Sequence, residues 1–304
     1  MANVLSALQI QQIVFAYVEA MAGYQSQFAK VCPVRDYGQG EVRVSRGAFG
    51  GIASTLSAGA TSSTVSNIAT FESTFNTAHR YVRHQLPSFK LKDDKGLIAI
   101  GQALAAVAMK NIDREIGSGL EGLLAANAPR VGTGVGQVGS GKKFFDTAKK
   151  GLQSESGEFT WANLVASTLS ESSLDAALQL MIKWRDDRGL QMMLGRSNNL
   201  ALVCAASNLS TAIKLTGSGV TDADLQKNWR NGMFGGGITP WEFDDSDVAL
   251  LVDVDATPFA YNLVGVPNIE AGVFDPMLTT FLVEYDGCFL YSPYEYGAVA
   301  LNAE

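Results

Sequence analysis

The chain is poor in the residues that usually carry chemistry at a metal or catalytic site. It has three cysteines, Cys32, Cys204 and Cys288, at wide spacing, which excludes a disulfide framework and a thiolate metal site. Its two histidines, His79 and His84, stand beside arginines rather than carboxylates. No serine lies in a Gly-x-Ser-x-Gly elbow. We therefore expect no catalytic residues, no bound metal and no cofactor.

Positive charge and long apolar runs are also scarce. There are 30 acidic and 23 basic side chains, for a net charge of -7, the wrong sign for general binding to a phosphate backbone. No segment reaches the roughly 18 uninterrupted apolar residues of a membrane helix. The apolar N-terminal stretch has no Lys or Arg before Lys30 and is interrupted by Glu19. We expect a soluble, intracellular protein with no membrane contact.

One stretch, GQVGSGKK at 136–143, is close to a nucleotide-binding loop. Gly136, Gly141 and Lys142 fit the pattern, but Lys143 stands where magnesium needs a Ser or Thr hydroxyl. The residues before this stretch follow a predicted helix, whereas a P-loop follows a buried strand. We interpret the stretch as a glycine- and lysine-rich loop.

Two helices are expected in the first part of the chain, one near the N-terminus and one from about residue 97. Apolar residues recur at helical spacing from 10 to 21, and again over LIAIGQALAAVAMKNIDREI at 97–116, where Gly101, Ala105 and Ala108 would admit another element closely. Gly117, Gly119 and Gly122 have low helix propensity, so this second helix either frays or ends there, or continues to Ala126 as a rod of about 45 Å. Between the helices, residues 31–68 are rich in Gly, Ser and Thr and predict an extension or disorder. The segment FESTFNTAHRYVRHQLPSFKL fits either a strand or an irregular helix.

The second half mixes helices and strands. LDAALQLMIKWRDD and NLSTAIKL predict helices, and NLALVCAA, VALLVDV and AYNLVGV predict strands. In FLVEYDGCFLY, Asp286 and Gly287 separate two apolar runs, which predicts a hairpin with a type I′ turn at those residues. Ala298 to Leu301 is expected to return to the same sheet as a last strand. The pattern indicates an α+β protein.

This order of parts resembles that of the major capsid proteins of tailed bacteriophages, whose fold is shared with encapsulins and herpesvirus shells. The resemblance rests on KKFFDTAKKG at 142–151, on the helix, strand and helix from LDAAL to TAIKL, on VALLVDV through FAYNLV, and on FLVEYDGCFLYSPYEYGAVAL. It implies five parts. These are an N-terminal helical arm (1–30), an extended β loop and start of a peripheral domain (31–92), a spine helix and crossover (93–158), an axial domain (159–265) and C-terminal strands rejoining the peripheral domain (266–304).

The resemblance also implies a function. Copies of the chain would form hexamers and pentamers of an icosahedral shell around double-stranded DNA, with portal, scaffold and decoration proteins as partners, in a virion assembled in the host cytoplasm. The expected subunit contacts are Phe49, Gly50, Gly51, Ile52, Leu56, Arg80 and Arg83. Deleting 47–62 should leave a folded subunit that cannot assemble. The alternatives are an encapsulin-like nanocompartment, a phage tail protein and a P-loop enzyme.

Overall fold

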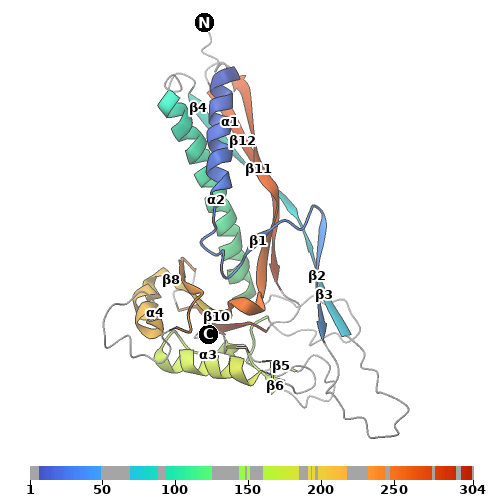
Figure 1. The fold of residues 1–304 in the computed structure, drawn as a ribbon, viewed down its shortest axis with the longest axis vertical. Coiled ribbons are helices and arrows are strands. Elements are labelled where there is room, and N and C mark those ends of the chain that lie inside the picture. The colour runs from blue at the N-terminus through green and yellow to red at the C-terminus, as the bar shows by residue number, and fades with distance from the viewer. Residues whose placement is uncertain are drawn as a thin grey trace, which may run out of the picture.

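The molecule is a long arm standing on a smaller base (Figure 1). The computed structural model describes residues 7–48, 69–87, 94–124, 144–147, 149–150, 160–184, 191–192, 194–195, 198–217, 232–243, 247–275, 278–291 and 296–302. The expected mixture of helices and sheets is confirmed.

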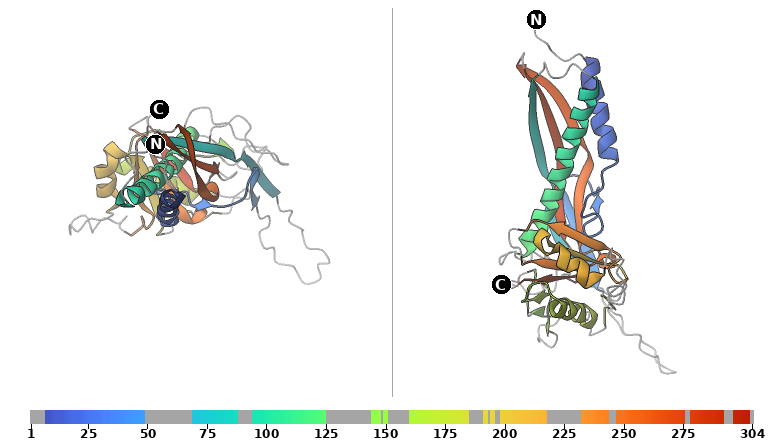
Figure 2. Two further views of the ribbon diagram at one scale, coloured as in Figure 1. Left: turned by 90° about the horizontal axis from the view of Figure 1, so that it is seen from above. Right: turned by 90° about the vertical axis from the view of Figure 1, so that its left-hand side faces the viewer.

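Two helices and a long sheet form the arm. α1 (Ala7–Ala22) packs on α2 (Asp94–Leu124), and α2 lies against the sheet (Figure 2). The sheet has the order β1-β11-β12-β4, with β1 at Val34–Arg35, β11 at Phe259–Asp275, β12 at Leu278–Tyr291 and β4 at Ala78–Pro87. Ile13 and Tyr17 of α1, Leu97 of α2 and Phe281 and Val283 of β12 share one core. The apolar spacing predicted α1 correctly, although Val18 remains 47% exposed.

α2 does not end at its glycines, so the longer of the two alternatives is the one observed. It has 31 residues and runs through Gly117, Gly119 and Gly122, about 46 Å at roughly 1.5 Å per residue. A Cβ on Gly117 would lie 2.2 Å from the Trp241 ring, and one on Gly119 would lie 2.4 Å from Cγ of Phe289. These glycines give room to aromatic rings of β9 and β12, and that packing outweighs their low helix propensity.

The base is built on a second sheet of five strands in the order β7-β13-β10-β8-β9. Their bounds are Leu164–Val165 for β7, Ala298–Leu301 for β13, Ala249–Asp253 for β10, Leu200–Ala205 for β8 and Gly237–Trp241 for β9. α3 (Glu171–Lys183) and α4 (Leu209–Thr216) complete the base. The Ser170 side chain caps α3 by accepting from the Ser173 N–H. Short elements are β5 (Lys149–Lys150), which pairs with β6 (Thr160–Trp161), and the 3₁₀ turns η2 (Ala206–Asn208) and η3 (Val254–Ala256).

Two predictions about the last third are wrong. Asp286 and Gly287 form no turn, because both lie inside β12 and pair with β11 on one side and β4 on the other. A Cβ on Gly287 would lie 2.4 Å from the Tyr261 hydroxyl oxygen, so a packing requirement explains this glycine. β13 does not join β12 either. It pairs with β10 and β7 in the base.

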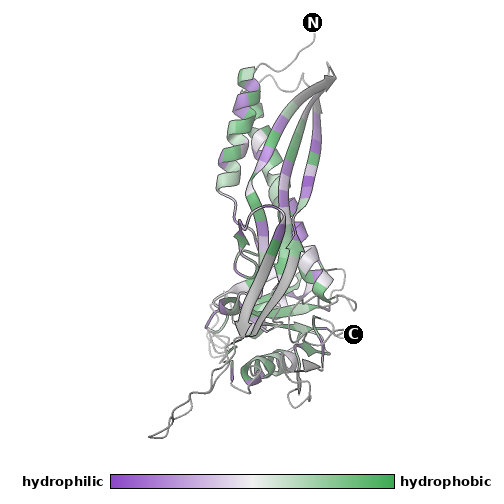
Figure 3. Ribbon diagram, turned by 90° about the vertical axis from the view of Figure 1, so that its right-hand side faces the viewer, coloured by the Kyte–Doolittle hydropathy of each residue, from purple (hydrophilic) through white to green (hydrophobic). Residues whose placement is uncertain are grey.

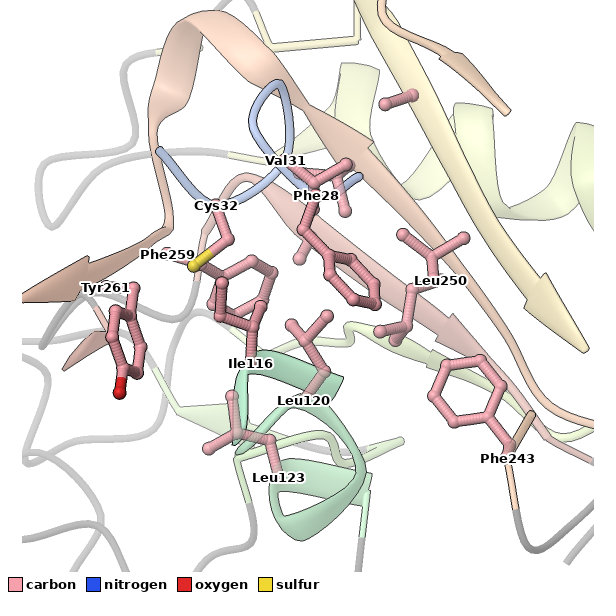
Figure 4. Packing of buried hydrophobic residues seen from close by; sticks show 14 of the residues in the cluster. Phe28, Val31, Cys32, Ile116, Leu120, Leu123, Phe243, Leu250, Phe259 and Tyr261 are labelled. Atoms are coloured by element: carbon pink, nitrogen blue, oxygen red, sulfur yellow. The ribbon is translucent and has the colours of Figure 1, made fainter. Parts of the chain in front are cut away.

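A shared core joins the arm to the base. Ile116, Leu120 and Leu123 from the end of α2 meet Leu250 of β10 and Phe259 of β11 (Figure 4). The segment that follows α1 contributes to the same cluster through Phe28, Val31 and Cys32. The end of α2 is therefore buried against both sheets at once.

A two-stranded ribbon leaves the body near this junction. β2 (Glu41–Ala48) and β3 (Ala69–Asn76) pair antiparallel, from Glu41 opposite Asn76 to Ala48 opposite Ala69. Figures 1 and 2 show the ribbon projecting to one side of the arm. The segment that fitted either a strand or an irregular helix forms β3 and β4.

Candidate functional site: the ribbon and its root

The ribbon is the part of the described chain that offers the most unpaired backbone. β2 and β3 pair with each other and with no other described strand. Eight residues of strand extend about 26 Å at roughly 3.3 Å per residue. The outer edge of each strand therefore presents a row of N–H and C=O groups on which another chain could add a strand.

The ribbon root, which we define as residues 36–42 and 75–79, is held firmly to the body. Val42 is buried, and the Phe75 ring packs edge-on against Tyr291 with the ring centroids 4.8 Å apart. Thr77 closes the root, because its N–H and its hydroxyl both donate to the Gly40 carbonyl at 2.9 and 3.0 Å. The Gly40 N–H donates back to the Thr77 hydroxyl at 2.8 Å.

The strand-like segment before the ribbon is fixed by polar side chains. Asp36 accepts from the N–H groups of Gly38 and Gly265 at 2.9 and 3.0 Å. The buried Asn262 accepts from the Tyr37 N–H at 2.8 Å and donates to the Gly38 carbonyl at 3.0 Å. Gly38 and Gly40 have φ angles of 94° and 89°, a backbone conformation that favours glycine.

A histidine and two carboxylates lie on the sheet at the root. His79 Nδ1 is 2.9 Å from Asp286 Oδ1, and its Nε2 is 3.8 Å from Glu284 Oε1. The Gln39 side chain donates to the other oxygen of Asp286 at 2.5 Å. These hydrogen bonds, that of Gln39 first and then that of His79, lower the pKa of Asp286. Asp286, for which a turn was predicted, thus links Gln39 of the ribbon root to β12.

A second carboxylate fastens α2 to the long sheet. Glu115 Oε1 accepts from Arg80 Nε at 2.9 Å and from the Tyr285 hydroxyl at 3.0 Å. Glu115 Oε2 accepts from the Tyr261 hydroxyl at 2.6 Å. Burial, and then the hydrogen bond to Glu115, raise the pKa of Tyr261. One side chain of α2 therefore holds β4, β11 and β12 together.

A pocket of about 540 Å³ opens beside Glu115, between α2 and the edge of the sheet. Its polar lining includes Arg80, Tyr81, Asn111, Arg114 and Ser118. The cavity is within the size range of ligand pockets.

The predicted contact residues fall into two groups. Phe49, Gly50, Gly51, Ile52 and Leu56 lie outside the described residues. Arg80 faces α2 and is engaged by Glu115, whereas Arg83 lies on the opposite face of β4 and is exposed. The sequence reading missed Glu115, Tyr261, Tyr285, Gln39 and Thr77. Arg80, Val82 and His84 are spaced two apart, so in a strand they share one face. The sequence alone did not decide that this segment is a strand, so it did not predict that Arg80 faces α2.

Side chains that bind metals do not gather in the described part of the chain. The described residues contain no group of three or more His, Cys, Asp or Glu side chains that could hold a metal ion. Cys32, Cys204 and Cys288 are free, and the first two are buried. None of the described helices is long and apolar enough to span a membrane. Residues 136–143, which resemble a nucleotide loop, lie outside the described residues.

Solved structures with the same architecture are shell proteins. The protein of the virus-like particle from Pyrococcus furiosus matches with a TM-score of 0.52 at 11% identity, covering 96% of this chain and 98% of that one. The capsid of the empty GTA particle matches with a TM-score of 0.52 at 11% identity over 92% and 98% of the two chains. Mycobacterium phage Patience gives 0.50 at 13% identity over 99% and 88%.

These likenesses extend over nearly the whole chain at very low sequence identity. No family model and no curated protein matches the sequence. The match therefore concerns the fold of the chain rather than any sequence motif. The chain has the fold of phage and virus-like-particle capsid proteins.

Proposed function

We propose that this protein is the major capsid protein of a tailed bacteriophage and that it acts by self-assembly. The observation that carries the proposal is the β2–β3 ribbon, which projects from a body with the capsid-protein fold and has no other described strand beside it. The function is a matter of shape and contact. Hexamers and pentamers of the subunit would close an icosahedral shell.

The body supports this role because its own helices and sheets supply the buried clusters found among the described side chains. The three buried clusters take residues from the helices, the long sheet and the base, so the subunit can fold before its ribbon finds a partner. Each backbone hydrogen bond gained on a neighbour contributes about 0.5–1.5 kcal/mol net. Several such bonds along both edges are enough to orient one subunit on the next.

The sequence between β2 and β3 suits a protein contact. Residues 49–68 contain no Asp, Glu, Lys or Arg, so placing them on another subunit would desolvate no charged side chain. We propose that Phe49, Ile52 and Leu56 contact the neighbouring subunit there. Gly50 and Gly51 would let the chain approach it closely.

The finer features of the proposal follow from a shell role. The net charge of -7 would keep a shell lining from adhering to packaged double-stranded DNA. Portal, scaffold and decoration proteins are the proposed partners, and the proposed location is the virion, after assembly in the host cytoplasm. The five parts drawn at residues 30, 92, 158 and 265 remain a proposal for how the subunit is divided.

Removing most of the ribbon while keeping its root tests the proposal. Residues 44–73 are replaced by Asn-Gly, which joins Arg43 to Thr74, an opposed pair of the ribbon, through a two-residue hairpin turn. We expect the variant to keep the wild-type melting transition and to form no closed particles in analytical ultracentrifugation and electron microscopy. A matched variant keeps both strands and replaces 49–68 by a Gly/Ser segment of equal length, which tests the side chains of that segment alone.

The particles formed by the wild-type chain decide between the related functions. Closed shells that contain double-stranded DNA support the proposal. Shells with protein cargo and no DNA would indicate a nanocompartment, and rings or tubes would indicate a tail protein. Closed shells at normal yield from the ribbon-deleted variant would show that assembly does not use the ribbon.

A further inference from the structure

The ribbon root contains a histidine placed between two carboxylates. His79 is 57% exposed, with Asp286 on one side and Glu284 on the other. Both carboxylates belong to β12, and β11 presents the uncharged Val264 opposite Asp286. Gln39 approaches from the ribbon side, and Tyr81 and then Arg83 follow His79 on this face of β4. Among the described residues, no other charged group forms an ion pair with His79.

This cluster lies where the chain leaves the long sheet and enters the ribbon. Gln39 lies between Gly38 and Gly40, the two positive-φ residues where the chain turns into β2. A Cβ on either glycine would meet nothing within 4 Å, so nothing packs against the chain at these two positions. The turn is restrained by hydrogen bonds, and the bond from Gln39 to Asp286 ties it to the long sheet at the point where His79 also binds.

We propose that the ribbon root is a proton-operated joint: protonation of His79 tightens the His79–Asp286–Gln39 cluster and holds the ribbon against the long sheet, and deprotonation loosens it. Neutral His79 provides a single hydrogen bond to Asp286. Protonated His79 provides a charged donor to Asp286 and attraction to Glu284 in addition. The charged form thus holds Asp286, which accepts from Gln39, more firmly against β4.

The direction of the pH effect follows from the two titrations. Histidine side chains ordinarily gain their charge as the pH falls through the range from about 8 to 5. Asp286 stays ionised over that range because its pKa is lowered in the folded protein. The contribution of Asp286 is present above its unfolded pKa and is lost only as the pH falls through the folded value. The joint is therefore tightest in mildly acidic solution, above the pH at which Asp286 protonates.

Hydrogen exchange on the full-length protein measures the joint directly, whether or not copies assemble. The reporters are the amides of Gly40 and Thr77, which bond across the root. After correction for the intrinsic effect of pH, we expect their exchange to slow roughly 1.5- to 5-fold between pH 7.5 and 5.5, the range for an exposed ion pair. His79→Gln and Asp286→Asn should each remove this pH response.

The second histidine supplies the matched control. The chain has only two histidines, and His84 lies on the opposite face of β4, opposite Phe281. His84→Gln should keep the full response at Gly40 and Thr77. The proposal is overturned if the wild-type root shows no response, if the response survives in His79→Gln, or if it is lost in His84→Gln. The ribbon-deletion test above can fail independently of this one, because exchange at the root does not require a shell.

Discussion

Two acidic residues of α2 show how single side chains shape this fold. Asp113 and Glu115 are two positions apart, so they leave the helix on opposite sides. Asp113 accepts from the hydroxyls of Tyr24 and Ser26 at 2.7 and 2.6 Å and so fastens the segment after α1. Glu115 fastens the long sheet. α2 is thereby fixed on both sides by hydrogen bonds to carboxylates.

Two buried tyrosines should respond in opposite ways to the loss of their hydroxyl groups. Tyr261 is fully buried and donates to Glu115, whereas Tyr17 is fully buried with no hydrogen-bond partner among the described residues. Burial alone raises the pKa of Tyr17 to about 12. Tyr261→Phe should lower the free energy of unfolding by about 1–3 kcal/mol, because Glu115 loses a donor. Tyr17→Phe should leave it unchanged or raise it by about 1 kcal/mol.

Urea denaturation followed by far-UV circular dichroism gives both free energies, and each variant is the control for the other. The two substitutions remove the same atom, so the difference isolates the hydrogen bond. Equal losses in the two variants would mean that the bond to Glu115 contributes nothing beyond the burial of the ring.

At the scale of elements, alanine substitutions at the glycines of α2 distinguish the effect of packing on stability from that of helix propensity. Gly119→Ala should destabilise the protein by about 1–3 kcal/mol, since its Cβ would approach the base of the Phe289 side chain, which cannot move without its strand. Gly117→Ala should cost less, because its Cβ would meet the ring of Trp241. Gly122→Ala meets nothing within 4 Å and should gain up to about 1 kcal/mol.

Thermal and urea unfolding of the three variants rank these effects on one helix. The order of stability should be Gly122→Ala, then Gly117→Ala, then Gly119→Ala. If Gly119→Ala were as stable as Gly122→Ala, the close contact between α2 and β12 would be refuted.

The sequence predicted the elements with a regular apolar pattern but not the roles of single glycines. Apolar periodicity found α1, α2, α3, α4, β8 and β10, because these elements bury one face or lie wholly inside. Predictions from local sequence were wrong or left open where contacts with residues distant in the sequence determine the structure. Gly119 looked like a helix end and Gly287 like a turn, yet both exist to admit rings that lie more than 20 positions away in sequence, Phe289 and Tyr261.

The candidate site was less predictable for the same reason. Gln39, His79 and Asp286 meet only after β4 pairs with β12 and the ribbon folds back. Nothing in their local sequence indicates that they are neighbours. The general expectation of an extension in this region could be read from composition, because such a long segment lacked a core-forming pattern.

At the scale of the whole molecule, the arm and the base are distinct bodies joined by one core. The arm has its own cluster around Leu97, and the base has its own around Trp184. Leu120 lies in the cluster that contacts both sheets (Figure 4). Figure 3 shows the long sheet and its helices rising from the base, with polar and apolar residues alternating along the strands. The subunit can therefore act as a single rigid piece only while the shared core is intact.

Two leucines of α2 test this coupling. Leu97 and Leu120 are both fully buried, the first in the arm core and the second in the shared core. Each change to alanine should cost about 2–5 kcal/mol. Tryptophan fluorescence reports the base and its junction with α2, since Trp184 lies in the base core and Trp241 packs against the shared core. Far-UV circular dichroism reports the arm helices as well. Leu120→Ala should lower both unfolding midpoints together, whereas Leu97→Ala should lower the circular dichroism midpoint more than the fluorescence midpoint. A Leu120→Ala variant that shifts only one of the two signals would show that the arm and the base unfold independently.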